Sequence, residues 1–310
     1  MSTLAISRPH PHQKRPARDL VRLVRPRQWA KNLLVVPLAL LDTPAVNLGA
    51  AGRIAWAILL FCVASSFIYV INDIADRHRD RAHPIKRDRP IASGRMAVRV
   101  AAACAAGLLV LLGLMLAVSS ATWPVLVYLG LNLCYCFWLK HLPLLDVFIV
   151  AIGFALRATY GYLVLGTHLS PWLLTSVFLL CLVLIVGKRR HEASTVGAEH
   201  RPSLRGYSVQ YLDYLFVLTM VLTFTAFLLY LSASRFAAPY TDAALMISVP
   251  CGLFGLARYL QVVVVEHAGG DPVRVLMSDR PMLASAALWT VLLGLTLLAS
   301  QHPGLVGGSI

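Results

Sequence analysis

The sequence predicts an all-α integral membrane protein, a bundle of about nine transmembrane helices. Of its 310 residues, 58% are hydrophobic and only 14% are charged, a balance outside the range of ordinary soluble domains. The apolar residues form continuous runs instead of alternating with polar ones, which favours spanning helices over the strands of a barrel.

Each apolar run has about 17–25 residues, enough to cross a hydrocarbon core as a helix. The count is approximate because charges interrupt the first run and the fourth follows the third closely. In chain order the runs are 22–43, 53–71, 97–118, 121–138, 144–166, 170–187, 209–233, 243–263 and 281–299.

Basic residues distinguish the two ends of the predicted spans. Of the 28 lysines and arginines, the loops after the first, third, fifth and seventh runs hold only Arg53 and Arg235. Because cytoplasmic loops are enriched in Lys and Arg, this predicts a cytoplasmic N-terminus, an exterior C-terminus and an odd number of spans in a bacterial inner or plasma membrane. The net charge of +14 then reflects topology, and we expect no nucleic-acid partner.

The ends of the chain are predicted to flank a single folded region. Residues 1–19 are rich in Pro, His and Arg, lack the apolar core of a signal peptide and are expected to be a disordered basic cytoplasmic tail. Residues 20–300 form the predicted transmembrane catalytic domain, and 301–310 a short exterior tail. The sequence is compatible with a homo-oligomer.

An acidic pattern follows the second apolar run. Asn72, Asp73, Asp76 and Asp80 share one helical face, because a helix turns by about 100° per residue. Closely spaced carboxylates repel one another unless a cation joins them, and oxygen ligands suit Mg²⁺. The pattern therefore predicts a Mg²⁺ site with all four as ligands and the three aspartates as catalytic residues.

Basic residues come directly after the aspartates. Lys86, Arg87 and Arg89 place anion-binding charge beside the predicted metal face, which indicates a diphosphate site at a membrane surface. The alternative is an ordinary solvated loop. The spacing of the aspartates on one face favours a site.

The first run opens with RPRQWAKN, in which Gln28, Lys31 and Asn32 are candidate substrate-binding residues. The alternative is that the basic side chains extend to lipid headgroups, with Trp29 as an interfacial anchor.

Two charged residues of the fifth run share a helical face. Asp146 lies at the inner end, and Arg157 lies roughly 16 Å deeper. An ionisable residue near mid-membrane is costly and suggests function, so we expect Arg157 to meet a substrate anion, with Tyr160 lining the same cavity. The alternative is structural pairing with an inward carboxylate.

The sixth run ends with GKRRHEAS, on the same predicted side as the aspartates. Lys188 and Glu192 are four residues apart, with Arg189 beside them, and all three, like Asp146, are candidate substrate-binding residues. The alternative is a salt bridge at a helix end.

The Asn72-Asp73-x-x-Asp76-x-x-x-Asp80 pattern at the end of a second transmembrane helix resembles the first aspartate motif of the UbiA superfamily of membrane prenyltransferases. The resemblance covers roughly residues 20–300. It implies a helical membrane bundle that holds Mg²⁺-diphosphate at the cytoplasmic end of a central cavity.

One segment departs from the prenyl-transferring members, which typically carry a second acidic motif, Asp-x-x-x-Asp, after the sixth helix. This chain has Lys188 and Glu192 at the two acidic positions, so a cation replaces one metal ligand. That segment, RPRQWAKN, HPIKRDRPIASG, the stretch 157–161 and GGDPVRVLMSDRP together resemble the branch of polyprenyl-phosphate phosphoribosyltransferases. In the last segment, Arg274 stands where the resemblance leads us to expect an acidic residue.

The resemblance implies transfer of 5-phosphoribose from 5-phosphoribosyl 1-diphosphate to a decaprenyl-type polyprenyl phosphate, a precursor step for cell-wall arabinan. Mg²⁺ would stabilise the leaving diphosphate. The acceptor phosphate is already anionic and needs no strong general base. The phosphates would be bound by Lys31, Lys86, Arg87, Lys188 and Arg189.

Three other functions are compatible with parts of the sequence. The first aspartate motif alone allows a prenyltransferase that acts on an aromatic or haem-type acceptor, although the basic 188–192 segment argues against it. A transporter of anionic lipids would suit the membrane arginine, but the sequence shows no clear repeat. A scaffold without chemistry would leave the three aspartates unexplained.

Overall fold

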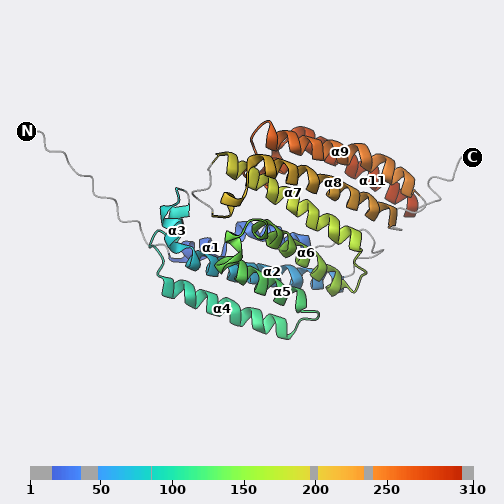
Figure 1. Ribbon diagram of the computed structural model, residues 1–310. Helices are drawn as coiled ribbons and strands as arrows, with labels where there is room; N and C mark the ends of the chain where they lie inside the picture. Colours follow the sequence, from blue (N-terminus) through green and yellow to red (C-terminus); the bar gives the residue numbers. More distant parts are fainter. Residues whose placement is uncertain (1–15, 36–47, 85, 196–201, 234–239, 302–310) are drawn as a thin grey trace, which may run out of the picture. The chain divides into compact units, whose positions relative to one another are not determined.

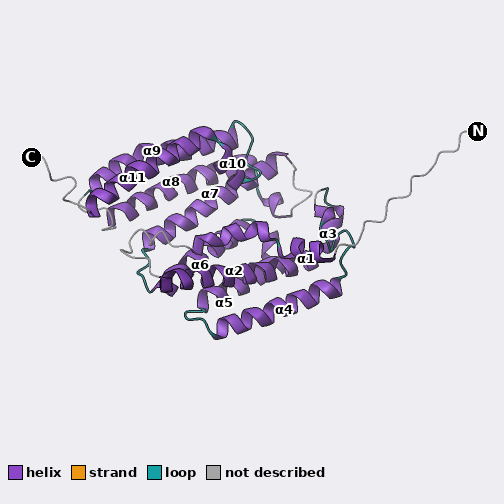
Figure 2. Ribbon diagram, turned by 180° about the vertical axis from the view of Figure 1, so that it is seen from behind, coloured by secondary structure: helices purple, strands orange, loops and turns teal. Residues whose placement is uncertain are grey.

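The computed structural model describes residues 16–35, 48–84, 86–195, 202–233 and 240–301. Within these ranges the chain forms helices and loops, with no strand (Figure 2). Six helices are long and apolar enough to cross a membrane (Figure 1). They are α2 (Leu48–Ala75), α4 (Val98–Ala117), α6 (Leu145–Leu165), α7 (Pro171–Thr195), α8 (Val209–Ala233) and α9 (Thr241–Val264).

Two further apolar helices are shorter over their apolar part, α5 (Trp123–Phe137) and α11 (Arg280–Gln301). These eight helices overlap the second to ninth predicted runs, although α2 begins five residues before its run and α7 continues eight residues beyond its run. The remaining elements are short: α1 (Pro16–Val24), η1 (Pro26–Val35), α3 (Arg77–Ala82), η3 (Lys86–Asp88), η4 (Leu139–His141), η6 (Pro202–Gly206) and α10 (Pro272–Ser278).

The first predicted run, 22–43, is not one α-helix over its described part. α1 ends at Val24, Arg25 has a φ of 53°, and a 3₁₀ helix follows from Pro26. The pyrrolidine ring of a proline disfavours the α conformation in the preceding residue, so Pro26 breaks the helix at Arg25. Residues 36–43 lie outside the described part of the chain.

The predicted tails differ from the structure at one boundary. The N-terminal tail was expected to reach residue 19, but α1 begins at Pro16, and Asp19 is buried with an ion pair to Arg95. Residues 1–15 and 302–310 lie outside the described residues.

The chain divides into two compact units. The first unit comprises Met1–Lys31 and Cys62–Val118, and the second comprises Asn32–Phe61 and Ser119–Ile310. The residues of α2 are therefore shared between the units. The single domain expected for 20–300 remains a prediction.

In the second unit, apolar helices that follow one another along the chain pack against each other. α6 contacts α5 and α7, α8 contacts α7 and α9, and α11 contacts α9 (Figure 1). Gly187 of α7 permits a close approach, because a Cβ there would lie 3.2 Å from both the Phe216 ring and the Tyr259 hydroxyl. Small residues at such contacts are typical of helices that associate inside a membrane.

Candidate functional site

The predicted metal face lies at the junction of α2 and α3 in the first unit. Asp76 separates the two helices, yet its N–H donates to the Asn72 carbonyl at 2.9 Å, and the Asp80 N–H donates to the Asp76 carbonyl at 2.8 Å. The helical register therefore continues through the junction. Asp73 and Asp80, seven residues apart, face the same partner.

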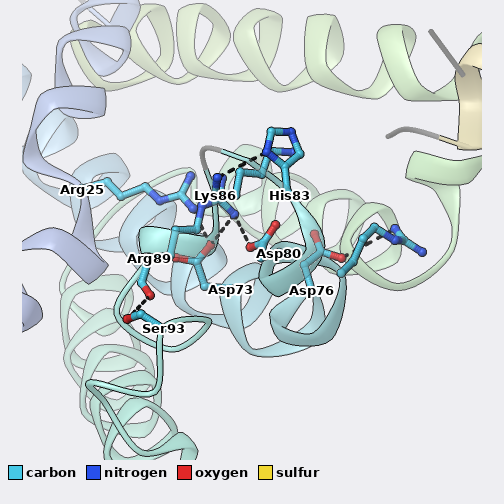
Figure 3. A network of polar contacts seen from close by, with 9 residues as sticks. Arg25, Asp73, Asp76, Asp80, His83, Lys86, Arg89 and Ser93 are labelled. Atoms are coloured by element: carbon cyan, nitrogen blue, oxygen red, sulfur yellow. Dashed lines mark hydrogen bonds and ion pairs between the residues drawn. The ribbon is translucent and has the colours of Figure 1, made fainter. Parts of the chain in front are cut away.

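That partner is Arg89, whose guanidinium bridges the two carboxylates (Figure 3). One nitrogen, Nη1, lies 3.0 Å from Oδ1 of Asp73 and 2.6 Å from Oδ2 of Asp80. Both aspartates are 3% exposed, whereas the Arg89 side chain is 24% exposed. The pair is thus buried and compensated by an arginine that reaches solvent.

A second arginine, Arg25, also binds Asp73 and was missed from the sequence. Its Nη2 donates to the same oxygen, Oδ1, and its guanidinium lies 5.0 Å from the centre of the Tyr69 ring. The partners are 48 residues apart, so no local pattern could show the contact. The Arg25–Pro26 pair signals only the helix break.

The backbone around Arg89 is fixed by a turn. The Ser93 N–H and hydroxyl both donate to the Arg89 carbonyl, at 2.9 and 2.7 Å (Figure 3). Gly94 has a φ of +76°, which a residue without Cβ adopts at little cost. Arg81 donates from Nε to the Ala92 carbonyl at 3.1 Å. The turn therefore directs the Arg89 side chain towards the aspartates.

The third aspartate has a different partner. Asp76 pairs with Arg79 at 3.9 Å. In the view of Figure 3, Asp80 lies between Arg89 and Asp76. Asn72 is half-buried one turn before it. Among the residues that the structure describes, no three His, Cys, Asp or Glu side chains gather as a metal-ligand set.

The other predicted residues of the first unit are more accessible. Lys86 is half-buried in η3, where its N–H donates to Nδ1 of His83 at 3.3 Å, and Arg87 beside it is exposed. Gln28 is half-buried and Lys31 exposed in η1.

The chemistry of this donor set fits Mg²⁺. The candidate ligands are oxygens, and two buried carboxylates already direct oxygens to one positively charged atom of Arg89. Asp76 is one turn away on the continuing helix and would complete the set by a side-chain movement. Its present ion pair is long and half-exposed, which opposes that movement weakly.

In the second unit, Arg157 is buried among neutral groups. Nε donates to Oδ1 of Asn32 at 2.9 Å, Nη1 to the Gly153 carbonyl at 2.7 Å and Nη2 to the Tyr128 hydroxyl at 3.0 Å. Three aromatic rings surround the guanidinium, with ring centres 4.6–5.5 Å from Cζ. In the described part of the chain, no carboxylate pairs with Arg157.

Asp146 binds a different set of residues from Arg157, although both lie on α6. It accepts hydrogen bonds from Nε of Arg189 at 2.9 Å, from the Ser203 hydroxyl at 3.0 Å and from the Tyr207 hydroxyl at 2.7 Å. Its side chain is fully buried. These bonds join the start of α6 to the end of α7 and to η6.

Tyr207 and Ser203 were not predicted, because they lie 61 and 57 residues from Asp146. Burial, together with the hydrogen bond to Asp146, raises the pKa of Tyr207 above its usual value. The hydroxyl therefore stays protonated and remains a donor at neutral pH. Its oxygen also accepts the backbone N–H of Leu144, at the start of α6.

The close packing around this network makes Gly206 sensitive to substitution. A Cβ on Gly206 would lie 2.8 Å from Cβ of Pro143 and would overlap its Cγ. We expect Gly206→Ala to lower the free energy of unfolding by about 1–3 kcal/mol, because the proline ring cannot rotate away. Gly113→Ala is the control, since nothing lies within 4 Å of its added methyl group. Thermal unfolding in detergent would compare them, and equal midpoints would contradict the prediction.

Lys188, Arg189 and Glu192 meet near the end of α7 in ion pairs, the arrangement of the alternative interpretation, and their substrate-binding role stays a prediction. Arg189 donates from Nη1 to Glu192 at 2.7 Å, and Lys188 lies 3.9 Å from the same carboxylate. The Arg189 side chain is 5% exposed and the Lys188 side chain 46%. Lys188 is therefore the solvent-accessible cation of the segment. Arg189 is buried and binds the same Glu192 carboxylate that Lys188 contacts. Tyr160, 0% exposed, packs edge-on against Phe61 with ring centres 5.7 Å apart.

The segment 269–281 contains the short helix α10, which was not predicted. Asp271 caps it by accepting the Arg274 N–H at 3.3 Å, and Pro272 occupies its first turn. Asp279 then binds Nη2 of Arg258 at 2.7 Å, and this hydrogen bonding holds the pKa of Asp279 below its usual value. In the described residues, the contacts of this segment cap α10 and join α9 to α11 through the Arg258–Asp279 pair.

Comparison with known sequences gives a consistent result. Residues 33–269 match the family model described as the UbiA prenyltransferase family. A decaprenyl-phosphate phosphoribosyltransferase from Corynebacterium glutamicum is 35% identical over 286 residues, 89% of this chain and 86% of that protein. The protein of the same name from Mycolicibacterium smegmatis is 40% identical over 215 residues, 64% of this chain and 66% of its own.

Solved structures show a similar fold. A UbiA homolog from Archaeoglobus fulgidus bound to DMAPP and Mg²⁺ has a TM-score of 0.68 at 18% identity, with 90% of this chain and 99% of that chain covered. At this level of identity the similarity concerns the fold alone.

Proposed function

The chain belongs to the UbiA prenyltransferase family, and from this premise we propose that it is a Mg²⁺-dependent polyprenyl-phosphate phosphoribosyltransferase. Its substrates are 5-phosphoribosyl 1-diphosphate and a decaprenyl-type phosphate. Relatives that carry the name decaprenyl-phosphate phosphoribosyltransferase support this, at 31–40% identity.

The observation that carries the proposal is the state of Lys188 and Arg189. Prenyl-transferring members place a second acidic motif here, whereas this chain has an accessible lysine and an arginine whose charge is balanced by buried Asp146. An accessible cation suits the additional phosphate groups of a phosphoribosyl donor and a phosphorylated acceptor. A prenyl diphosphate acting on a neutral aromatic acceptor would not need it.

In the proposed reaction, an oxygen of the polyprenyl phosphate forms a bond to C1 of the donor as the bond from C1 to the diphosphate breaks. The acceptor oxygen is already anionic, so no side chain has to remove a proton. Asn72, Asp73, Asp76 and Asp80 would hold Mg²⁺, which would supply neutralising charge to the departing diphosphate.

The basic and amide residues bind and orient the anionic groups. Lys31, Lys86, Arg87 and Arg89 supply positive charge in the first unit, and Lys188 supplies it in the second. Asp146, Arg189 and Glu192 are also proposed to bind substrate, and they form the ion pairs beside Lys188. The remaining proposed substrate-binding residues are Gln28, Asn32, Arg157 and Tyr160.

The protein is an integral membrane protein with multiple apolar helices. We place the N-terminus and the reacting groups on the cytoplasmic side and the C-terminus outside, with nine spans. The distribution of Lys and Arg between alternate loops supports this orientation.

A product assay tests the function directly. Detergent-purified protein, Mg²⁺, labelled 5-phosphoribosyl 1-diphosphate and a long polyprenyl phosphate are expected to give a labelled lipid, and chelation of Mg²⁺ should abolish it. If no labelled lipid forms but an aromatic acceptor is prenylated from a prenyl diphosphate, the proposal is wrong and the chain is a prenyltransferase.

A further inference from the structure

Arg89 neutralises Asp73 and Asp80, two of the residues that would hold a metal ion under the proposed function. We propose that Arg89 is an exchangeable counter-ion, so that its guanidinium and the divalent cation bind these two aspartates alternately. The exchange rests on the proposed function for the identity of the entering ligand, a metal-bound diphosphate. The arrangement itself follows from two buried carboxylates that share one nitrogen, at 3.0 and 2.6 Å (Figure 3).

The other arginine of the cluster does not have this role. Arg25 contacts Asp73 without bridging to Asp80, and its guanidinium also lies over the Tyr69 ring. Its backbone φ of 53° is unusual for a residue other than glycine, and such strain is typically maintained by surrounding contacts. Arg25 is therefore a counter-charge for Asp73 alone, whereas Arg89 holds the two carboxylates together.

Exposure shows which member of the bridge is able to leave. The side chains of Asp73 and Asp80 are 3% and 5% exposed, while that of Arg89 is 24% exposed. The turn closed by Ser93 holds the Arg89 backbone in place. A rotation of the Arg89 side chain towards solvent would vacate the carboxylates without unfolding either helix.

The exchange also connects two roles of Arg89. Its planar guanidinium can bind a phosphate group through two parallel hydrogen bonds, as it binds carboxylates. If a diphosphate enters with the metal, the Arg89 guanidinium would bind the diphosphate while the two aspartates bind the metal. Without that anion, the cation would face the repulsion of a guanidinium within the same site.

The test is a Mn²⁺ titration of the substrate-free full-length protein in detergent, followed by the electron paramagnetic resonance of free Mn²⁺. We expect Arg89→Gln to bind Mn²⁺ about tenfold or more tighter than the wild type, because the competing charge is gone. Arg95→Gln is the matched control. It removes one positive charge from the same unit, but Arg95 pairs with Asp19 and the Asp88 carbonyl, so its affinity should stay within about twofold of the wild type.

Two results would overturn the exchange. One is an Arg89→Gln affinity equal to or below that of the wild type, and the other is an equal increase in both glutamine variants. Arg89→Lys keeps a charge but loses the planar fork, so it should bind Mn²⁺ more tightly than the wild type and more weakly than Arg89→Gln. It serves as the test variant if Arg89→Gln folds poorly. The product assay is a separate measurement: a wild type that transfers phosphoribose while Arg89→Gln and Arg89→Lys show no gain refutes the exchange alone. Gain without phosphoribosyl transfer refutes the proposed function alone.

Discussion

Asp73→Asn is expected to reduce phosphoribosyl transfer on the order of 10³-fold, the rate equivalent of about 4 kcal/mol of lost charge stabilisation. Asp73 is the residue on which the cluster converges, since both Arg25 and Arg89 bind its Oδ1. The amide keeps the size and one acceptor oxygen but loses the negative charge that a divalent cation requires. Turnover in the product assay measures the effect.

Asp88→Asn provides the control for that substitution. Asp88 is an exposed carboxylate of η3, adjacent in sequence to Arg89, and Asp73 and Asp80 are the carboxylates that Arg89 binds. Its substitution should leave turnover within about twofold, because a single exposed charge contributes little. Membrane insertion should be similar for the two variants. Full Mg²⁺-dependent activity in Asp73→Asn would remove Asp73 from the metal site.

Most helix positions were predictable because continuous apolar runs carry a strong and local signal. The runs 209–233 and 243–263 differ by no more than two residues at either end from α8 and α9. The prediction failed for 22–43, where hydropathy conceals the effect of Pro26 on the preceding residue. α10 has a readable start, Asp271 followed by Pro272, but seven residues give a weak periodic signal.

In the site, local spacing was predictable from the sequence, whereas contacts between distant residues were not. The spacing of the aspartates predicts their common helical face, and the i,i+4 spacing places Lys188 beside Glu192, although their salt bridge was only the alternative interpretation. The contacts of Arg25 with Asp73 and of Tyr207 with Asp146 depend on tertiary packing across 48 and 61 residues. No local pattern encodes such a contact, so it was found only in the structure.

Arg157→Met is expected to lower kcat/KM by about 10- to 100-fold without lowering the thermal midpoint. The activity loss corresponds to a charged hydrogen bond to a substrate anion, about 1.5–3 kcal/mol. For the fold, the substitution leaves the buried Asn32 oxygen without its donor, at a cost of about 1–3 kcal/mol. It also removes a buried guanidinium whose partners are neutral, and the desolvation of such a charge costs several kcal/mol. The relief of this desolvation cost should equal or exceed the cost of the unpaired Asn32 oxygen, so the thermal midpoint should not fall.

A paired arginine gives the contrasting result. Arg258 binds the carboxylates of Asp279 and Glu266, so Arg258→Met leaves two acidic groups without their partner and should lower the thermal midpoint. Activity and thermal midpoint, measured for both variants, distinguish an arginine that binds substrate from an arginine that stabilises the fold. If Arg157→Met retains full activity, or if it unfolds as readily as Arg258→Met, then Arg157 is a structural residue of α6. The combination of lost activity and retained stability is what a guanidinium held among neutral groups should produce, because its strongest anionic partner would be the substrate.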